Sequence, residues 1–386
     1  MRPGIAIAAL VAAAVIVLGV MSTSRPDKTI EVVPPEPAFG TTDRAADTGI
    51  VTPPYGDDQP SLRELADEAG LLIGAAVEPE DMAWEPLYNP TVAREFNILT
   101  TENVLKFGLI RKTANRYVFG PADVIVDFAA QNGLQVRGHT LVWHEQLPDW
   151  LKVADYDREE LSDLLEEHVK TVVGRYEGRI QYWDVLNEAV DWDGSLRDTM
   201  WLEKLGPEYM DFAFEWAHEA DPEAKLYYND FSAEGLGDKS DAVYALVKGM
   251  VERGVPIDGV GFQGHFNLED PPNTEDVAAN IERLAALGLD VQFTEVDVRI
   301  EEPVTDEKLG VQAGVYWNML SVCVENPACT AFVTWGVTDK FSWITSFLDG
   351  YAAGLLFDEN YEPKPAYWAL RDVLERSLNL GPYAAD

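Results

Sequence analysis

The feature that most constrains the fold of this chain is a repeated alternation of short apolar runs and longer amphipathic stretches, which begins near Ser61. Several runs are continuous and β-branched rather than alternating in polarity, as in strands that are buried on both faces of a parallel sheet. The eight strand candidates are Leu71–Val77, Ile98–Val104, Gln135–Trp143, Gln181–Asn187, Ala224–Asn229, Gly259–His265, Val291–Asp297 and Ala331–Val337.

Helical patterns fill the stretches between these runs. They include Glu159–Tyr176, Pro207–Ala220, Lys239–Arg253, Thr274–Leu287, Thr305–Val324 and Pro365–Leu378. Eight strand–helix units in about 320 residues predict an α/β fold, a (β/α)8 TIM barrel that occupies residues 61–386. A doubly wound open sheet is the alternative, but no Gly-rich phosphate loop follows the first apolar run.

The amino terminus has a different character. An uninterrupted apolar run over residues 5–20 follows Arg2. It is long for the apolar core of a signal peptide and short for a membrane span of about 20 residues. We therefore expect residues 1–21 to be a signal peptide or a membrane anchor, with possible membrane attachment through residues 5–21. Either alternative places the rest of the chain outside the cell or at the cell surface.

Residues 22–60 are polar and contain seven Pro, including two Pro-Pro pairs. Such a composition cannot bury enough apolar surface to order itself, so we expect a Pro-rich disordered linker. Two Cys occur further on, Cys323 and Cys329. Without neighbouring His or Cys this spacing makes a poor zinc site, and an exported chain favours a local disulfide over two free buried thiols.

The charge balance is strongly acidic. Asp and Glu number 67 against 29 Lys and Arg, for a formal net charge of −38. Hydrophobic residues at 47% exclude a largely disordered chain. A negative surface of this strength repels phosphate backbones, so we expect a protein that binds no nucleic acid. We expect it to be a monomer.

Polar and aromatic residues collect where the predicted strands end. Such residues are rare in strands because burying a bare polar group costs several kcal/mol. In a barrel of this kind the carboxyl ends of the strands meet around one pocket, where the chemistry takes place. In chain order the residues are Glu102, Asn103, Lys106, His139, Trp143, Asn187, Glu188, Asn229, Asp230, Gln263, His265, Glu295, Asp297, Trp335 and Trp343.

Two of the carboxylates are candidates for catalysis. Glu188 follows a hydrophobic strand, whereas Glu295 and Asp297 are two apart and share one side of another strand. Glycoside hydrolysis uses one carboxyl group to protonate the leaving oxygen and a second to attack or to activate water. His265 could stabilise Glu295 as the anion while Asp297 orients the imidazole. The alternative is that both glutamates form structural ion pairs that close the barrel.

Other catalytic classes fit the sequence less well. His144-Glu145 begins like a zinc-protease motif, but Pro148 occupies the place of the second His. No G-x-S-x-G elbow occurs, so a serine triad has no support. Aromatic residues such as Trp143, Trp335 and Trp343 suit stacking on the apolar faces of sugars. We expect no cofactor and no catalytic metal.

At these residues the sequence resembles glycoside hydrolase family 10, the (β/α)8 endo-β-1,4-xylanases. The resemblance runs from about Leu71 to Leu378. Its motifs are specific as a set because all eight occur in order. They are TENVLKF (101–107), GHTLVWHEQLPDWL (138–151), WDVLNEAV (183–190), YYNDFSAE (227–234), GFQGHF (261–266), TEVDV (294–298), WGVTDKFSW (335–343) and LLFDENYEPKPAYWAL (355–370).

The resemblance implies a retaining double displacement that cleaves internal linkages of xylan, with Glu188 as acid/base and Glu295 as nucleophile. It also implies that Asn187 binds the sugar 2-hydroxyl and that Asp297 acts through His265. Further residues would bind substrate: His139, Gln263, His265 and Trp335 around the sugar being cleaved, with Glu102, Asn103, Lys106, Trp143 and Trp343 on the non-reducing side. Cys323 and Cys329 fit a disulfide that many members carry.

Two other functions remain open at this stage. The same fold could favour β-1,4-glucan, since the cellulose and xylan backbones differ by the exocyclic hydroxymethyl group. A catalytically inactive carbohydrate-binding protein is the alternative from another class, although both carboxylates are present.

Overall fold

The computed structural model describes residues 31–32 and 59–380. Within them, eight parallel strands form a closed barrel, because β10 pairs with both β8 and β11 while β11 pairs with β2. The TIM barrel predicted from the alternating pattern is confirmed. Its strands are β2 (Leu72–Val77), β3 (Ile98–Thr101), β5 (Gln135–Val142), β6 (Tyr182–Asn187), β7 (Lys225–Asp230), β8 (Gly259–Phe262), β10 (Asp290–Glu301) and β11 (Cys329–Thr334).

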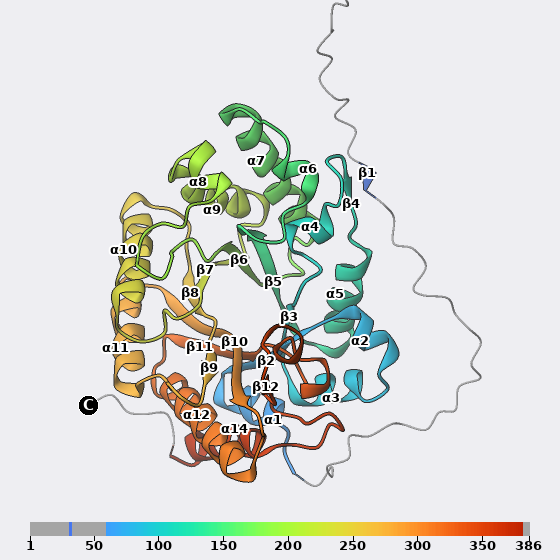
Figure 1. The fold of residues 1–386 in the computed structure, drawn as a ribbon, viewed down its shortest axis with the longest axis vertical. Helices are drawn as coiled ribbons and strands as arrows, with labels where there is room; N and C mark the ends of the chain where they lie inside the picture. Colours follow the sequence, from blue (N-terminus) through green and yellow to red (C-terminus); the bar gives the residue numbers. More distant parts are fainter. Residues whose placement is uncertain (1–30, 33–58, 381–386) are drawn as a thin grey trace, which may run out of the picture.

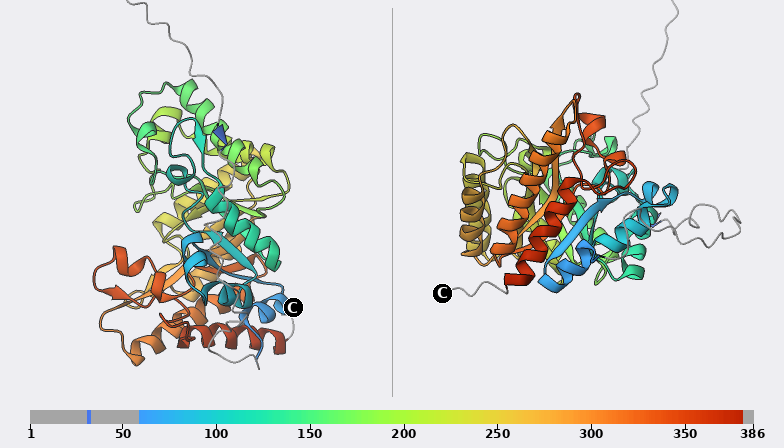
Figure 2. Two further views of the ribbon diagram at one scale, coloured as in Figure 1. Left: turned by 90° about the vertical axis from the view of Figure 1, so that its right-hand side faces the viewer. Right: turned by 90° about the horizontal axis from the view of Figure 1, so that it is seen from below.

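Helices surround the strands (Figure 1). The carboxyl-terminal helix α14 packs between α1 and α12, so the two ends of the barrel sequence lie together (Figure 2). The larger helices are α1 (Leu62–Ala69), α3 (Tyr88–Glu95), α5 (Gly120–Asn132), α7 (Arg158–Arg175), α9 (Glu208–Ala220), α10 (Asp238–Arg253), α11 (Thr274–Ala285), α12 (Asp306–Glu325) and α14 (Pro365–Leu380). Short helices in the connections are α2 (Pro79–Trp84), α4 (Phe107–Ile110), α6 (Asp149–Lys152), α8 (Met200–Leu205) and α13 (Ile344–Phe347).

Local sequence signals fix where the helices begin and end. The first helix starts with a capping box in which Ser61 and Glu64 satisfy each other's backbone N–H groups. It ends at Gly70, whose φ of 73° is left-handed and therefore suits a residue without a side chain. The longer helix α7 starts with the same kind of box, formed by Asp157 and Glu160.

Four strands end three or four residues away from the sequence expectation. The runs expected to reach Val104 and Val337 end at Thr101 and Thr334. The other two differences shape the rim of the barrel. The run expected to extend through His265 ends at Phe262, because Gly264 turns the chain with a φ of 78°. A separate short strand, β9 (His265–Asn267), then pairs with β10. Strand β10 itself continues to Glu301, four residues beyond the expected end, since β9 and β12 (Tyr351–Ala352) both pair with its extension.

Little of the amino-terminal part is described. Glu31 and Val32 form the two-residue strand β1, which pairs in parallel with β4 (Arg116–Tyr117). The expected signal peptide or anchor at 1–21 and most of the expected linker at 22–60 lie outside the described residues and stay predictions. Within residues 31–32 and 59–380, none of the helices is both long enough and apolar enough to cross a bilayer.

The two cysteines form a disulfide with an S–S distance of 2.05 Å. It joins the last turn of α12 to the first residue of β11. This bridge is the local disulfide favoured by the sequence.

Candidate active site

Residues from the carboxyl ends of the barrel strands meet at one end of the barrel. Glu188 follows β6 directly, and Glu295 lies in the middle of β10. Strand β10 places Glu295 beside the residue that follows β8, because the Glu295 backbone N–H donates to the carbonyl of Gln263 at 2.9 Å. The parallel barrel thus brings together two carboxylates that are more than a hundred residues apart in the sequence.

Glu295 is buried, with 4% of its surface exposed, and polar groups surround its carboxylate. Asn229 donates from Nδ2 to Oε1 at 2.7 Å, and the Nε2 of His265 lies 3.2 Å from Oε2. The Nδ1 of His139 lies 3.8 Å from Oε1. Three partners from three different strands therefore hold this side chain in one orientation.

The electrostatics of this cluster favour an ionised Glu295. Burial alone would raise its pKa, but the nearby His139 and His265 outweigh burial and lower the pKa below its ordinary value. Burial would likewise lower the pKa of His265, yet the carboxylates of Asp297 and Glu295 raise it to about 10. The site consequently contains an imidazolium between two carboxylates at neutral pH.

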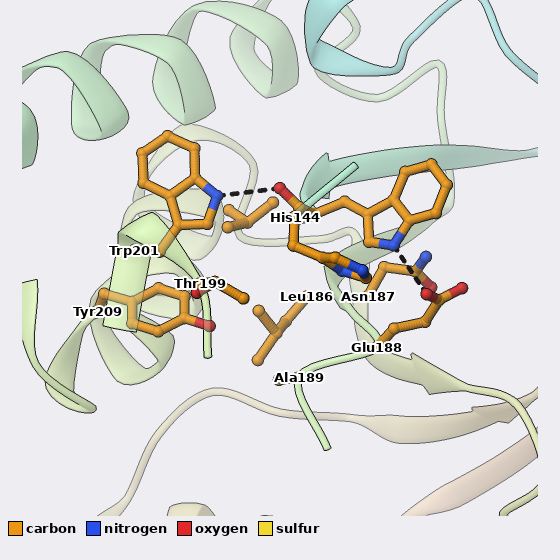
Figure 3. Close-up of a pocket in the computed structure, with 10 residues that line it drawn as sticks. His144, Leu186, Asn187, Glu188, Ala189, Thr199, Trp201 and Tyr209 are labelled. Atoms are coloured by element: carbon orange, nitrogen blue, oxygen red, sulfur yellow. Dashed lines mark hydrogen bonds between the residues drawn. The ribbon is translucent and has the colours of Figure 1, made fainter. Parts of the chain in front are cut away.

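Glu188 has different surroundings. Its Oε2 accepts a hydrogen bond from the indole Nε1 of Trp143 at 2.9 Å, and its Oε1 accepts one from Nε2 of Gln263 at 3.0 Å. Glu188 also lines a small pocket with residues of β5, β6, α8 and α9, in which Glu188 and Asn187 lie near one end and Trp201 and Tyr209 near the other (Figure 3). Both partners of the carboxylate are neutral donors, unlike those of Glu295.

Three amide side chains connect the two carboxylates. Gln263 contacts Glu188, and its Nε2 also lies 3.4 Å from the side chain of Asn187. The side-chain amides of Asn187 and Asn229 approach to 2.8 Å, and Asn229 in turn donates to Glu295. The three amides therefore lie in contact across the floor of the site, with Gln263 bonded to one glutamate and Asn229 to the other.

A second polar layer lies beneath this floor, inside the barrel. The Nδ1 of His139 lies 2.9 Å from Oδ2 of Asp184, and the guanidinium of Arg137 contacts the same carboxylate at 2.5 Å. Burial opposes ionisation of Asp184, but Arg137 and His139 outweigh it and lower the pKa. This ion pair holds the His139 ring below Glu295.

Asp297 and Trp343 lie on the side of the site that carries His265. The fully buried Asp297 accepts hydrogen bonds through Oδ2 from Nδ1 of His265 at 3.0 Å and from Nε1 of Trp343 at 2.7 Å. The Trp343 ring packs edge-on against the His265 ring, with centroids 5.3 Å apart. Asp297 therefore fixes both the imidazole beside Glu295 and the indole of Trp343.

Lys106 lies between the aromatic residues on the other side. Its Nζ donates to Oδ1 of Asn103 at 2.7 Å and lies 5.2 Å from the Trp143 ring and 5.7 Å from the Trp335 ring. Burial lowers the pKa of Lys106, against the attraction of nearby glutamates. The residues predicted to bind the non-reducing side of the sugar chain are Glu102, Asn103, Lys106, Trp143 and Trp343. The first four lie together around Lys106, whereas Trp343 lies beside Asp297.

Two further carboxyl groups adjoin Lys106. Asn103 donates to Glu78 at 2.5 Å and to Glu102 at 3.4 Å. Burial raises the pKa of Glu102 to about 8 and that of Glu78 to about 7, and repulsion between the two adds to the rise for Glu102. Neutral carboxyl groups are donors as well as acceptors, which suits sugar hydroxyls.

Three members of this constellation were not predicted from the sequence. Asn229 was expected at the rim of the pocket, but its contact with Glu295 was not. Arg137 and Asp184 lie inside strands, where an ion pair across the barrel has no sequence signature. Glu78 lies just past the first strand, and only the fold brings it to Asn103.

These contacts describe a site with one buried carboxylate whose pKa is lowered and a second, partly buried carboxyl group held by neutral donors. Two such groups in one polar, aromatic-lined site are the equipment of glycoside hydrolysis. Across residues 31–32 and 59–380, no three or more His, Cys, Asp or Glu side chains are grouped to hold a metal ion.

Comparison with known proteins agrees with this chemistry. The chain is 44% identical over 329 residues to endo-1,4-beta-xylanase B of Thermotoga neapolitana. The alignment covers 84% of this chain and 94% of that protein. It is also 39% identical over 313 residues to a protein of Acetivibrio thermocellus named exoglucanase XynX, covering 78% of this chain and 28% of that protein.

Solved structures agree as well. Xylanase 10B of Thermotoga petrophila RKU-1, solved in complex with xylobiose, superimposes with a TM-score of 0.81 at 45% identity, over 84% of this chain and all of that one, 100%. The native xylanase 10B of Thermotoga maritima gives the same TM-score of 0.81 at 45% identity. The family model for glycosyl hydrolase family 10 matches residues 61–373, and the chain belongs to this family.

Proposed function

We propose that this protein is a retaining endo-β-1,4-xylanase in which Glu295 is the nucleophile and Glu188 the acid/base. The observation that carries the proposal is the difference between the two carboxyl groups. Glu295 is buried against charged and polar groups that lower its pKa. The Glu188 carboxylate, by contrast, accepts its hydrogen bonds from the neutral donors Trp143 and Gln263. The xylanase names of the relatives and the xylobiose complex support the substrate.

In the first step the Glu295 carboxylate attacks the anomeric carbon of the sugar, and the bond between that carbon and the glycosidic oxygen breaks. The protonated Glu188 gives its proton to the departing oxygen, so the leaving chain departs as a neutral alcohol. His265 and Asn229 stabilise Glu295 as the anion and set the direction of attack. The product of this step is a covalent glycosyl ester on Glu295.

In the second step Glu188 is a carboxylate and removes a proton from water, whose oxygen attacks the same anomeric carbon. The ester bond breaks and Glu295 returns to its ionised form. Two inversions at one carbon retain its configuration. The amide chain through Asn187 lies between the two carboxyl groups, where a sugar 2-hydroxyl would bind.

We propose that the cluster of Glu102, Asn103, Lys106 and Trp143 binds the substrate on the non-reducing side. The hydrogen-bonded side chains of Glu102, Asn103 and Lys106 offer polar contacts to hydroxyls, while Trp143 supplies an aromatic surface. On the side of the site that carries His265, Trp343 would cover the bound chain. Trp335, together with His139, Gln263 and His265, would surround the sugar whose linkage is cleaved.

Activity on β-1,4-glucan is the second candidate, and one observation favours it. The relative from Acetivibrio thermocellus carries the name exoglucanase. A glucan would have to fit the hydroxymethyl group of the sugar being cleaved beside Trp335, which is almost fully buried. This crowding favours xylan as the preferred backbone.

We also propose that the enzyme is exported, through the apolar segment at residues 5–20. Degradation of a polymer outside the cell requires such a location. Amino-terminal sequencing of the protein from the medium and from membranes would distinguish a cleaved signal peptide from an uncleaved anchor. Protein that stays wholly in the cytoplasm would contradict export.

The function is tested by measuring release of reducing ends from xylan and from soluble cellulose side by side. The account predicts rapid release from xylan, slower release from cellulose, and a fall of at least about a thousandfold on both in Glu295→Ala, since the covalent route is lost. A Glu295→Ala protein that folds and retains activity would overturn the assignment. A wild-type protein that binds xylan without cleaving it would indicate the inactive binding protein instead.

A further inference from the structure

The backbone at Glu188 adopts a conformation that residues with a side chain rarely adopt. Its φ is 57°, in the left-handed region that favours glycine. In that region the Cβ atom crowds the carbonyl oxygen, so a non-glycine residue stays there only when its surroundings hold it. The direction of the Glu188 side chain therefore depends on the groups that fix its two flanking peptides.

Both flanking peptides are fixed by hydrogen bonds. On the amino side, the Glu188 N–H donates to the carbonyl of Asn229 at 2.9 Å, which is part of the barrel. On the carboxyl side, the Glu188 carbonyl accepts a hydrogen bond from Nε of Arg197 at 2.9 Å. The first contact belongs to the scaffold, whereas the second comes from a single side chain in a loop.

Arg197 is well placed to keep that carbonyl in position. Its backbone N–H donates to Ala189 at 2.8 Å, and a bridge joins Val190 to Leu196, so residues 189–197 form a hairpin that returns to Glu188. The guanidinium also donates to the Val190 carbonyl at 3.4 Å and pairs with Asp191 at 3.5 Å. Its side chain is 16% exposed, so the contacts are largely shielded from water.

We infer that Arg197 is a positioning residue for the proposed acid/base, which aims the Glu188 carboxyl group by fixing its carbonyl in the left-handed backbone conformation. The inference rests on the proposed function of Glu188. Within the described residues, the guanidinium hydrogen-bonds the carbonyls of Glu188 and Val190 and pairs with Asp191, whereas the Glu188 carboxylate is hydrogen-bonded by Trp143 and Gln263. The contact of Arg197 with the acid is therefore to its backbone carbonyl.

This role has a kinetic signature that a purely structural role lacks. Proton donation by Glu188 matters for a sugar leaving group and much less for dinitrophenolate, which leaves without a proton. Misaiming Glu188 should therefore slow cleavage of xylan while glycosylation of the enzyme by a dinitrophenyl xylobioside proceeds nearly as before. A general loss of the fold, or of substrate binding, would lower both rates together.

The test compares Arg197→Met and Arg197→Lys with the wild-type enzyme on both substrates. We expect Arg197→Met to lower kcat/KM on xylan about 10- to 100-fold, because general acid catalysis contributes about 10²- to 10⁴-fold in total. We expect the rate of the dinitrophenolate burst to change less than about threefold. Arg197→Lys retains one donor and should recover part of the xylan activity. Arg179→Met, at an exposed ion pair with Asp127, is the matched control and should behave like the wild type.

Thermal unfolding of each variant shows whether it is folded. Equal losses on the two substrates in a folded Arg197→Met, or no loss on either, would overturn the inference. If Arg197→Met fails to fold, the two substrates are compared in Arg197→Lys. A larger loss on xylan than on the dinitrophenyl xylobioside would support the inference, and equal losses or none would overturn it. Failure of the proposed function is recognised separately, because the wild-type enzyme itself would then release no reducing ends from xylan.

Discussion

At the scale of single residues, the site depends on His265, which lies between two carboxylates. Its Nε2 faces Glu295 at 3.2 Å and its Nδ1 faces Asp297 at 3.0 Å. Burial works against the charged imidazole, but the two acids raise its pKa to about 10, so it is an imidazolium throughout the neutral range. The positive charge in turn is one of the causes that lower the pKa of Glu295.

We predict that His265→Asn moves the acidic limb of the pH profile of kcat/KM to higher pH. A lowered pKa keeps Glu295 ionised as pH falls. Removal of the imidazolium leaves His139 to offset burial, so the pKa of Glu295 rises. An opposite charge at this range shifts a carboxyl pKa by about 1–3 units, so we expect a shift of about one unit or more. The exposed His218→Asn is the control and should leave the profile unchanged.

The measurement is kcat/KM on an aryl xylobioside between about pH 3 and pH 8, a range set by the ordinary pKa values of carboxylates and histidine. An acidic limb that stays in place in His265→Asn, or moves to lower pH, would contradict the electrostatic role of His265.

Much of this site is predictable from the sequence because strand ends in a barrel share one face. Glu188, Glu295 and His265 each follow or end an apolar run, and the fold alone then brings them together. Asp184 and Arg137 could not be predicted in the same way, since their pairing at 2.5 Å depends on neighbouring strands of the closed barrel. The φ of 57° at Glu188 likewise has no sequence signal, because left-handed backbone is expected at glycine or asparagine.

At the scale of elements, the apolar runs predict all eight barrel strands within a few residues. Two of the errors concern the ends of β8 and β10, where pairing between segments distant in the sequence decides how far a strand extends. Gly264 ends a strand that composition alone would continue, and β10 extends because β9 and β12 pair with it. These two changes place His265 and Asp297 on adjacent strands in register, since Asp297 pairs with His265 between β10 and β9.

The connection from α12 to β11 carries the Cys323–Cys329 disulfide. With a sequence separation of 6, it closes a short loop, whose entropic contribution is about 2 kcal/mol, below the roughly 3 kcal/mol of a 15-residue loop. We predict that the double variant Cys323→Ser, Cys329→Ser folds, unfolds at a temperature a few degrees lower, and keeps most of its activity. Melting curves and xylan assays check this. Loss of all soluble protein would mean that the bridge contributes more than its loop length implies.

At the scale of the whole molecule, charge dominates. The sequence has 38 more acidic than basic residues at neutral pH, counting histidine as neutral. Ion pairs on the described surface, such as those of Lys170 with Glu166 and Glu219, offset only a small part of this excess. The remaining carboxylates repel one another, and this repulsion opposes the compact state.

We predict that the melting temperature is higher in molar NaCl than in dilute buffer. Salt shortens the screening length from about 30 Å at 0.01 M to about 3 Å at 1 M, which removes most of the self-repulsion. Differential scanning calorimetry in both buffers measures the shift, with sucrose of equal osmolality as the control for general osmolyte effects. Equal melting temperatures would mean that the acidic surface serves solubility alone.

The two glutamates have different roles in this mechanism, and the product that azide forms in Glu188→Ala distinguishes them. Without the acid, a dinitrophenyl xylobioside still glycosylates Glu295, but deglycosylation by water becomes slow because no base is present. Azide attacks without losing a proton, so it should restore turnover. The account predicts a β-xylobiosyl azide, identified by the proton coupling at the anomeric carbon. An α-azide, or no rescue in a folded Glu188→Ala, would contradict the assignment of Glu188 as acid/base and Glu295 as nucleophile.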